Sequence, residues 1–180
     1  MENWTDLYQE LAQKISNNLS THIKWIDLWH DQIAYLTTEL PFPSPAVFIG
    51  FNTKSITDKS ILIQDINLQI DFYLFYETFS DTYQGAYNQQ SALDFMRILT
   101  LIHQLFHGQS GVNYSNLTRS DLKRVESGGA GNLYVISFDT VVEDASAVVQ
   151  YNQQQVNQVQ VTPQPSMPVP AIDTNQLYII

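Results

Sequence analysis

The sequence of 180 residues contains no cysteine, which excludes disulfide bonds, thiolate zinc sites, iron–sulfur clusters and a cysteine nucleophile. Charged residues are scarce, at 14% of the chain against about 25% in an average soluble domain. Bases are the scarcest, because eight Lys and Arg stand against 18 Asp and Glu and give a formal net charge of −10. Since nucleic-acid binding relies on bases that neutralise phosphates, we expect no specific nucleic-acid partner.

Long apolar runs are also absent. No run approaches the roughly 20 residues of a membrane-spanning helix, and the N-terminus lacks the basic start and apolar core of a signal peptide. We therefore expect no membrane partner and a protein made and used in a cytoplasm. The sequence does contain the material for a core, because 44% of its residues are hydrophobic and 12% are aromatic.

Apolar residues recur at three- and four-residue spacing in two segments, which predicts two α-helices. Residues 4–19 are predicted to form an amphipathic N-terminal helix. Residues 92–106 carry apolar side chains around most of the helix circumference, so we expect this helix to be buried and closed by Gly108.

Four other segments favour strands. An apolar run at residues 46–51, entered through a proline-rich stretch, predicts a buried strand. Apolar and polar residues alternate strictly over residues 66–76, and we expect this strand to pair antiparallel with residues 46–51 across a polar turn at residues 52–60. Residues 117–125 and 133–143 predict two further strands.

Two segments have a less regular pattern. Residues 126–132 are rich in glycine and predict the turn between the last two strands. Residues 22–30 are dense in β-branched and aromatic residues, which favours a strand, although strand and helix both stay open for residues 22–38. Together the segments predict an α+β fold, a mostly antiparallel sheet of about four to five strands packed against one buried helix.

The composition changes near residue 146, which predicts an α+β domain at residues 1–146 and an extended arm rich in Gln, Val and Pro at residues 147–180. From Gln150 onward the sequence has one acid, Asp173, and no base. The apolar end of the arm predicts a segment that docks on another surface. It consists of Leu177, Tyr178, Ile179 and Ile180.

No enzyme signature is present, so we expect no catalytic residues, no cofactor and no metal site. His103 and His107 have the spacing of two metal ligands on a helix, but the segment lacks the glutamate of the His-Glu-x-x-His zinc motif. The glycine run at residues 128–131 precedes a predicted strand, not the helix that a phosphate-binding loop needs. A polar helix end and a hairpin turn explain these two features.

The one concentration of positive charge in the sequence is formed by Arg119, Lys123 and Arg124. Three bases are too few for a DNA duplex. In an acidic protein they suit contact with an acidic face of a neighbouring copy, which would be a head-to-tail interface. A solvated strand face explains them equally well.

The order of the predicted elements, together with the proline-led strand Pro43-Ser44-Pro45-Ala46-Val47-Phe48-Ile49, resembles the tail terminator and neck-completion proteins of tailed bacteriophages. The resemblance covers about residues 4–145. It implies a small α+β domain whose copies form a ring, typically a hexamer, that caps the completed tail tube and joins it to the head. The partners would then be other copies, the tail tube and the neck or connector proteins, in a virion assembled in the bacterial cytoplasm.

We predict a subunit interface that includes the basic cluster and the apolar end of the arm. Its residues are Arg119, Lys123, Arg124, Leu177, Tyr178, Ile179 and Ile180. The long arm departs from the simple family pattern, and an arm that adds a strand to a neighbouring sheet would link subunits or adjacent rings. The alternative function is a non-enzymatic protein-binding adaptor, for example another neck or connector component.

Overall fold

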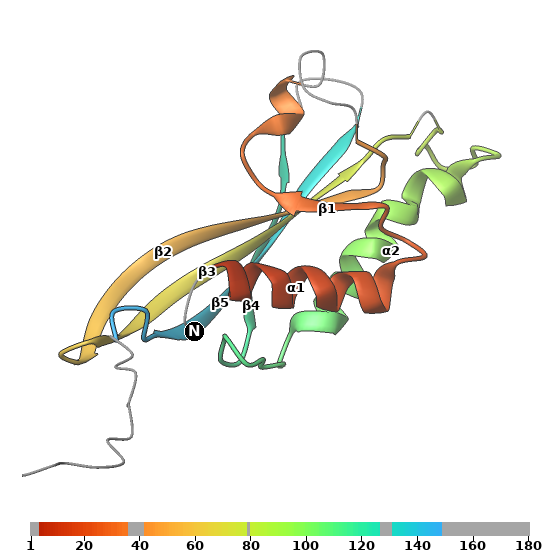
Figure 1. Cartoon of the computed structure of the whole chain (residues 1–180). Coiled ribbons are helices and arrows are strands. Elements are labelled where there is room, and N and C mark those ends of the chain that lie inside the picture. Colours follow the sequence, from red (N-terminus) through yellow and green to blue (C-terminus); the bar gives the residue numbers. More distant parts are fainter. Residues whose placement is uncertain (1–3, 36–41, 79, 127–130, 149–180) are drawn as a thin grey trace, which may run out of the picture. The chain divides into compact units, whose positions relative to one another are not determined.

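The computed structural model describes residues 4–35, 42–78, 80–126 and 131–148 (Figure 1). The elements are α1 (Trp4–Leu19), β1 (Trp25–Leu28), the 3-10 helix η1 (Gln32–Tyr35), β2 (Ala46–Ser60), β3 (Ile63–Tyr76), α2 (Gln89–Phe106), β4 (Thr118–Val125) and β5 (Asn132–Asp144). The predicted arm lies outside the described residues from residue 149 onward. Residues 127–130 of the predicted glycine-rich turn also lie outside them.

The strands form one five-stranded sheet in the order β1-β2-β3-β5-β4. β1 pairs parallel with β2, whereas the other three neighbouring pairs are antiparallel. The predicted α+β fold with a mostly antiparallel sheet is confirmed, and so is the antiparallel pairing of the two central predicted strands. None of the described helices is long and apolar enough to cross a membrane.

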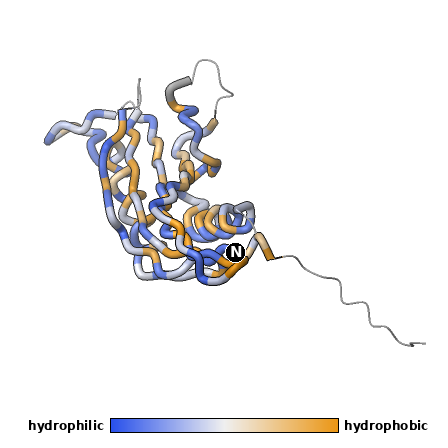
Figure 2. Tube along the Cα trace, turned by 90° about the vertical axis from the view of Figure 1, so that its left-hand side faces the viewer, coloured by the Kyte–Doolittle hydropathy of each residue, from blue (hydrophilic) through white to orange (hydrophobic). Residues whose placement is uncertain are grey.

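Both helices pack on one face of the sheet and bury the larger of two hydrophobic clusters (Figure 1). Hydrophobic and hydrophilic residues alternate along the strands (Figure 2), as the sequence pattern of β3 predicts. Phe72 at the centre of β3 stacks on Phe106 of α2 with ring centroids 4.4 Å apart. β3 supplies the core side chains Ile66, Leu68, Ile70, Phe72 and Leu74.

α2 is the predicted buried helix, although it begins at Gln89 rather than at residue 92. Its side chains are buried or half-buried around most of the circumference, but Met96 is exposed. Gly108 follows the helix with φ +74°, a conformation that favours glycine, and its N–H donates to the Leu117 carbonyl at 2.8 Å. The predicted closure of the helix by Gly108 is confirmed.

A second, smaller hydrophobic cluster lies on the opposite face of the sheet, around Phe48 of β2 and Phe75 of β3. Trp29 belongs to it and stacks on Tyr73 with ring centroids 4.0 Å apart. The two clusters together cover both faces of β2 at its N-terminal end. This explains why residues 46–51 form an unbroken apolar run. The question left open for residues 22–38 has a mixed answer up to residue 35, because strand β1 is followed by the 3-10 helix η1. Residues 36–38 lie outside the described residues.

The polar turn predicted at residues 52–60 is wrong, because β2 continues through Ser60 and the turn is made by Ile61 and Leu62. Pairing with β3 continues to Ser60, opposite Ile63, although a register shift interrupts it near Lys54. Polar side chains bond across the strands here, for example Lys54 Nζ to Asp139 at 2.7 Å. The segment is hydrophilic because this part of the ribbon faces solvent, and β3 still supplies its hydrogen-bond partners.

Candidate assembly interface

The basic cluster predicted from the sequence lies on β4, an exposed strand at one edge of the sheet. Register with β5 places Arg119 opposite Phe138 and Arg124 opposite Tyr134, so both arginines lie on the helix-bearing face. Lys123 pairs with Val135 and lies on the other face. The structure therefore brings the two arginines together on one face and separates Lys123 from them.

The three bases also differ in their charge partners. Lys123 Nζ lies 3.0 Å from Asp121, and this bond, followed by the bond from the Leu122 N–H, lowers the pKa of Asp121. Arg119 and Arg124 form no salt bridge with any residue in the part of the chain that the structure describes. Two positive charges on the helix-bearing side of β4 are therefore available to a partner.

An apolar groove of about 370 Å³ lies between β4 and α2, beside Arg119. Met96 of α2 and Leu122 of β4 are 51% and 45% exposed, unusual values for large apolar side chains beside one another. We call this surface the α2–β4 groove. It is lined by Met96, Leu99, Thr100, His103, Arg119, Leu122 and Tyr134.

Two histidines connect the end of α2 to β4. His107 Nδ1 accepts the backbone N–H of Arg119 at 3.1 Å, and the His103 and His107 rings lie 4.7 Å apart. His103 Nδ1 is buried and has no hydrogen-bond partner among the described residues. Burial lowers the pKa of His103, and the positive charges of Arg119 and His107 lower it further. Within the described ranges, no group of three or more His, Asp or Glu side chains is placed to hold a metal ion.

The β2–β3 hairpin carries an apolar tip that the sequence analysis missed. Ile61 is 99% exposed and Leu62 is 45% exposed. Lys59 contacts Glu143 closely and lies 4.0 Å from Asp65, while Gln64 bonds to Asp58 at 2.8 Å. Among the described residues, the acids around the tip outnumber the bases. The acids are Asp58, Asp65, Glu143 and Asp144.

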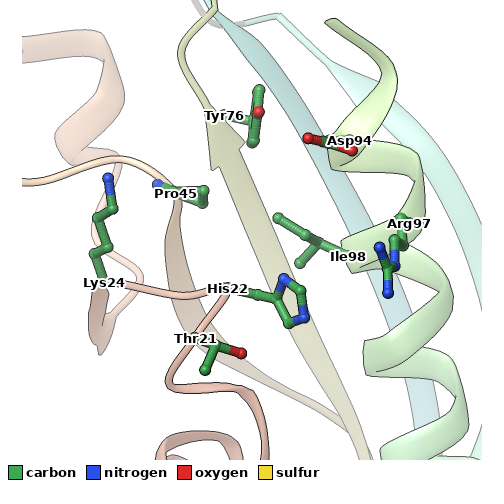
Figure 3. Close-up of a pocket in the computed structure, with 8 residues that line it drawn as sticks. All are labelled: Thr21, His22, Lys24, Pro45, Tyr76, Asp94, Arg97 and Ile98. Carbon is green, nitrogen blue, oxygen red and sulfur yellow. The ribbon is translucent and has the colours of Figure 1, made fainter. Parts of the chain in front are cut away.

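A separate polar pocket of about 210 Å³ lies where the loop after α1 meets α2 (Figure 3). Its lining carries both signs of charge, with His22, Lys24 and Arg97 against Asp94. In Figure 3 Asp94 lies near Tyr76, whereas Lys24 extends away from Arg97. Burial and the charge of Asp94 raise the pKa of Tyr76. This mixed lining selects no ligand of one charge, unlike the apolar groove beside β4.

No protein-family model matches the sequence, and no curated protein matches it. Among solved structures, the chain is similar to a chain described as "Virion of native gene transfer agent (GTA) particle", with 10% sequence identity and a TM-score of 0.43. The similarity covers 76% of this chain and 94% of that one. Tail termination and ring formation stay predictions, and residues 177–180 of the predicted interface lie outside the described residues.

Proposed function

We propose that the protein is a non-enzymatic structural component of a phage-like virion. Its copies assemble into a ring, expected to be a hexamer, that terminates the tail tube and joins it to the head or neck. Assembly takes place in the bacterial cytoplasm, and the completed ring belongs to the virion. Like the predicted lack of catalytic residues, these statements rest on the sequence resemblance and on the surface described next.

The observation that supports self-assembly is the α2–β4 groove, an apolar surface beside two arginines that have no acidic partner among the described residues. The chain carries a net charge of −10, so an acidic surface of a neighbouring copy is a complementary partner. Apolar burial supplies most of the affinity in such contacts, and the charges select the partner and the orientation.

The backbone of β4 is poorly suited to accept another strand. Asp121 Oδ1 accepts the Leu122 N–H at 2.8 Å, and a register shift interrupts the pairing of β4 with β5 between Arg119 and Asp121. Charged side chains and strand irregularities protect sheet edges against added strands. We therefore expect the neighbouring copy to contact the side chains of the groove rather than extend the sheet.

Light scattering of the purified full-length chain over a range of concentrations tests this proposal. We expect a species near six times the 20.6 kDa of one chain, and closed rings in electron micrographs. A mass of one chain at every concentration, together with binding to an added protein, would favour the adaptor function instead.

A further inference from the structure

The apolar hairpin tip and the α2–β4 groove lie at opposite ends of the β3–β5 pair. Tyr134 of the groove pairs with Leu74, whereas the tip adjoins Ile63 at the other end of β3. The groove is in register with β3 from Ile70, which Phe138 links to Arg119, to Leu74. These positions lie seven to eleven residues from Ile63, which corresponds to about 23–36 Å at about 3.3 Å per residue. In Figure 1 the hairpin accordingly projects past α1, away from α2. The tip of a copy therefore does not reach the groove of the same copy.

The two surfaces are complementary in apolar character. Ile61 and Leu62 project from a two-residue turn, which is narrow enough to enter a groove, and the groove between α2 and β4 exposes Met96 and Leu122. Burial of exposed apolar side chains against one another lowers the free energy, so contact between the tip and the groove is favourable for both surfaces.

They are also complementary in charge. Asp58, Asp65 and Asp144 surround the tip, while Arg119 and Arg124 lie on the groove side of β4 without acidic partners among the described residues. Lys59, the one base near the tip among the described residues, contacts Glu143 and lies 4.0 Å from Asp65, so Asp58 and Asp144 are the tip carboxylates that no described base neutralises. Contact between the two surfaces pairs these carboxylates with the two arginines, whereas tip-to-tip contact brings like charges together.

We propose that the β2–β3 hairpin tip of one copy inserts Ile61 and Leu62 into the α2–β4 groove of a second copy of this chain. This inference rests on the proposed function and names the contact that would build the ring. Because the two surfaces differ and lie far apart, the contact is head-to-tail. Repeated contacts of this kind form a closed ring when the rotation between copies closes, and a filament when it does not.

Chemical cross-linking between engineered cysteines tests the contact directly, because the native chain has no cysteine. The full chain carrying both Ile61→Cys and Met96→Cys is treated with a thiol-reactive cross-linker much shorter than about 23 Å. We expect a ladder of covalent oligomers. A matched control carries Val112→Cys with Met96→Cys, because Val112 is a highly exposed apolar residue on the loop after α2 and not on the β2–β3 hairpin. The control is expected to yield no ladder.

Mixing two variants tests the head-to-tail geometry. Ile61→Ser with Leu62→Ser removes the tip and leaves the groove intact, whereas Leu122→Asp with Arg119→Glu alters the groove and leaves the tip intact. Each variant alone is expected to assemble at a concentration at least about tenfold higher than the unaltered chain, the loss typical of a central interface residue. A mixture of the two retains one intact tip and one intact groove, so it is expected to form dimers that grow no further. Val112→Ser is expected to assemble like the unaltered chain.

Each contrary result has a definite meaning. If the unaltered chain and the tip variant assembled equally well, the tip-and-groove contact would be overturned and the proposed ring would stand. An unaltered chain that never assembles would overturn both. Cross-linking of Ile179→Cys, but not of Ile61→Cys, to Met96→Cys would show that the arm occupies the groove, and would also overturn the contact.

Discussion

Glu10 shows how a single side chain joins distant parts of this chain. Its carboxylate accepts the backbone N–H groups of Val112 at 2.7 Å and Asn113 at 2.9 Å, and also the Asn113 side-chain amide at 2.9 Å. These bonds hold the loop after α2 against α1. Nearby, Lys14 Nζ donates to the Tyr114 hydroxyl at 3.1 Å, and Tyr114 is buried in the main core.

Replacement of Glu10 by alanine is expected to lower the free energy of unfolding by about 1–3 kcal/mol, because three donors lose a charged acceptor. Urea denaturation followed by circular dichroism measures the change. Gln9→Ala, an exposed substitution on the same helix, is the control and is expected to change stability by less than about 0.5 kcal/mol. Equal effects of the two variants would contradict the role assigned to Glu10.

Tyr114 is expected to ionise late. Burial, together with the charge of Glu10, raises the pKa of Tyr114 to about 12. Because the folded-state pKa exceeds the unfolded value of about 10, the stability linked to this group is complete below pH 10 and is lost as the pH rises towards 12. Ultraviolet titration of the unaltered chain and of Tyr114→Phe isolates this group. Glu10→Gln is expected to lower the pKa of Tyr114, and an unchanged value would contradict the contribution of Glu10.

Phe95 tests the assignment of the core helix. It is buried, and its ring stacks on Tyr134 with centroids 5.2 Å apart. Phe95→Asp is expected to abolish cooperative unfolding, because it buries a carboxylate without a base at a cost of several kcal/mol. The next residue provides the matched control, since Met96 is exposed and Met96→Asp is expected to keep the fold. Thermal melts that are alike for the unaltered chain and Phe95→Asp would refute the core assignment.

Among the elements, the junction of α2 with β4 combines stability with recognition. His107 fixes the start of β4 through the Arg119 N–H, and His103 lies between the groove and the core residue Phe138. The same short region therefore positions Arg119 and forms one wall of the groove. A change in the charge of this junction is expected to alter both folding and assembly.

His103 is expected to make this junction sensitive to acid. Its folded-state pKa lies below the ordinary value of 6.5, so the unfolded chain takes up the proton first. The stability linked to neutral His103 is present above about pH 6.5 and is lost as the pH falls through the folded-state pKa. Urea denaturation at about pH 7.5 and about pH 5 is expected to show a smaller loss of stability for His103→Gln than for the unaltered chain.

The control for this experiment is His22→Gln, which removes an imidazole far along the chain, in the polar pocket after α1. It is expected to keep the pH dependence of the unaltered chain. If His103→Gln and the unaltered chain lost the same stability in acid, the sensitivity would belong to other groups.

At the scale of the whole molecule, the described residues place the groove and the hairpin tip at opposite ends of the same sheet. That arrangement suits growth by repeated contacts, because each copy presents both halves of the proposed interface. The predicted arm at residues 147–180 adds a further segment whose apolar end was expected to dock on another surface.

Removal of residues 150–180 is expected to leave the fold intact and to weaken assembly. The reason is the change of composition at Gln150, after which the segment is rich in Gln, Asn, Val and Pro and carries a single acid and no base. Thermal unfolding measures the first expectation and light scattering the second. Loss of cooperative unfolding in the shortened chain would show that the arm is part of the folded domain.

Much of the fold was predictable from local patterns. The spacing of α1, the strict alternation of β3 and the apolar run of β2 each report which side chains face the core, and all three predictions were confirmed. The polar half of β2 was not predictable in this way, because its hydrogen-bond partners come from β3, not from its own composition. The hairpin tip was missed for the same reason, since the turn was expected at residues 52–60 and in the structure it lies at Ile61 and Leu62.

The candidate interface was predicted only in part. A cluster of Arg119, Lys123 and Arg124 is visible in the sequence, but strand register separates Lys123 from the two arginines. The groove was not foreseen, because Met96 and Leu122 lie on different elements and are neighbours only when α2 packs beside β4. Met96 lies within a helix that the sequence predicts to be covered on most sides, and Leu122, flanked by charged residues on β4, is the one local sign of the groove.

The sequence by itself determined the two helices, the cores of four strands, their order and the face that each buries, because hydrophobic periodicity acts over neighbouring residues in the chain. It also determined the acidic charge and the lack of thiol chemistry. Only the tertiary structure decided which strands lie at the sheet edges, which bases share a face and where apolar side chains stay exposed. Those properties depend on pairing between segments far apart in the sequence, and no local pattern contains them.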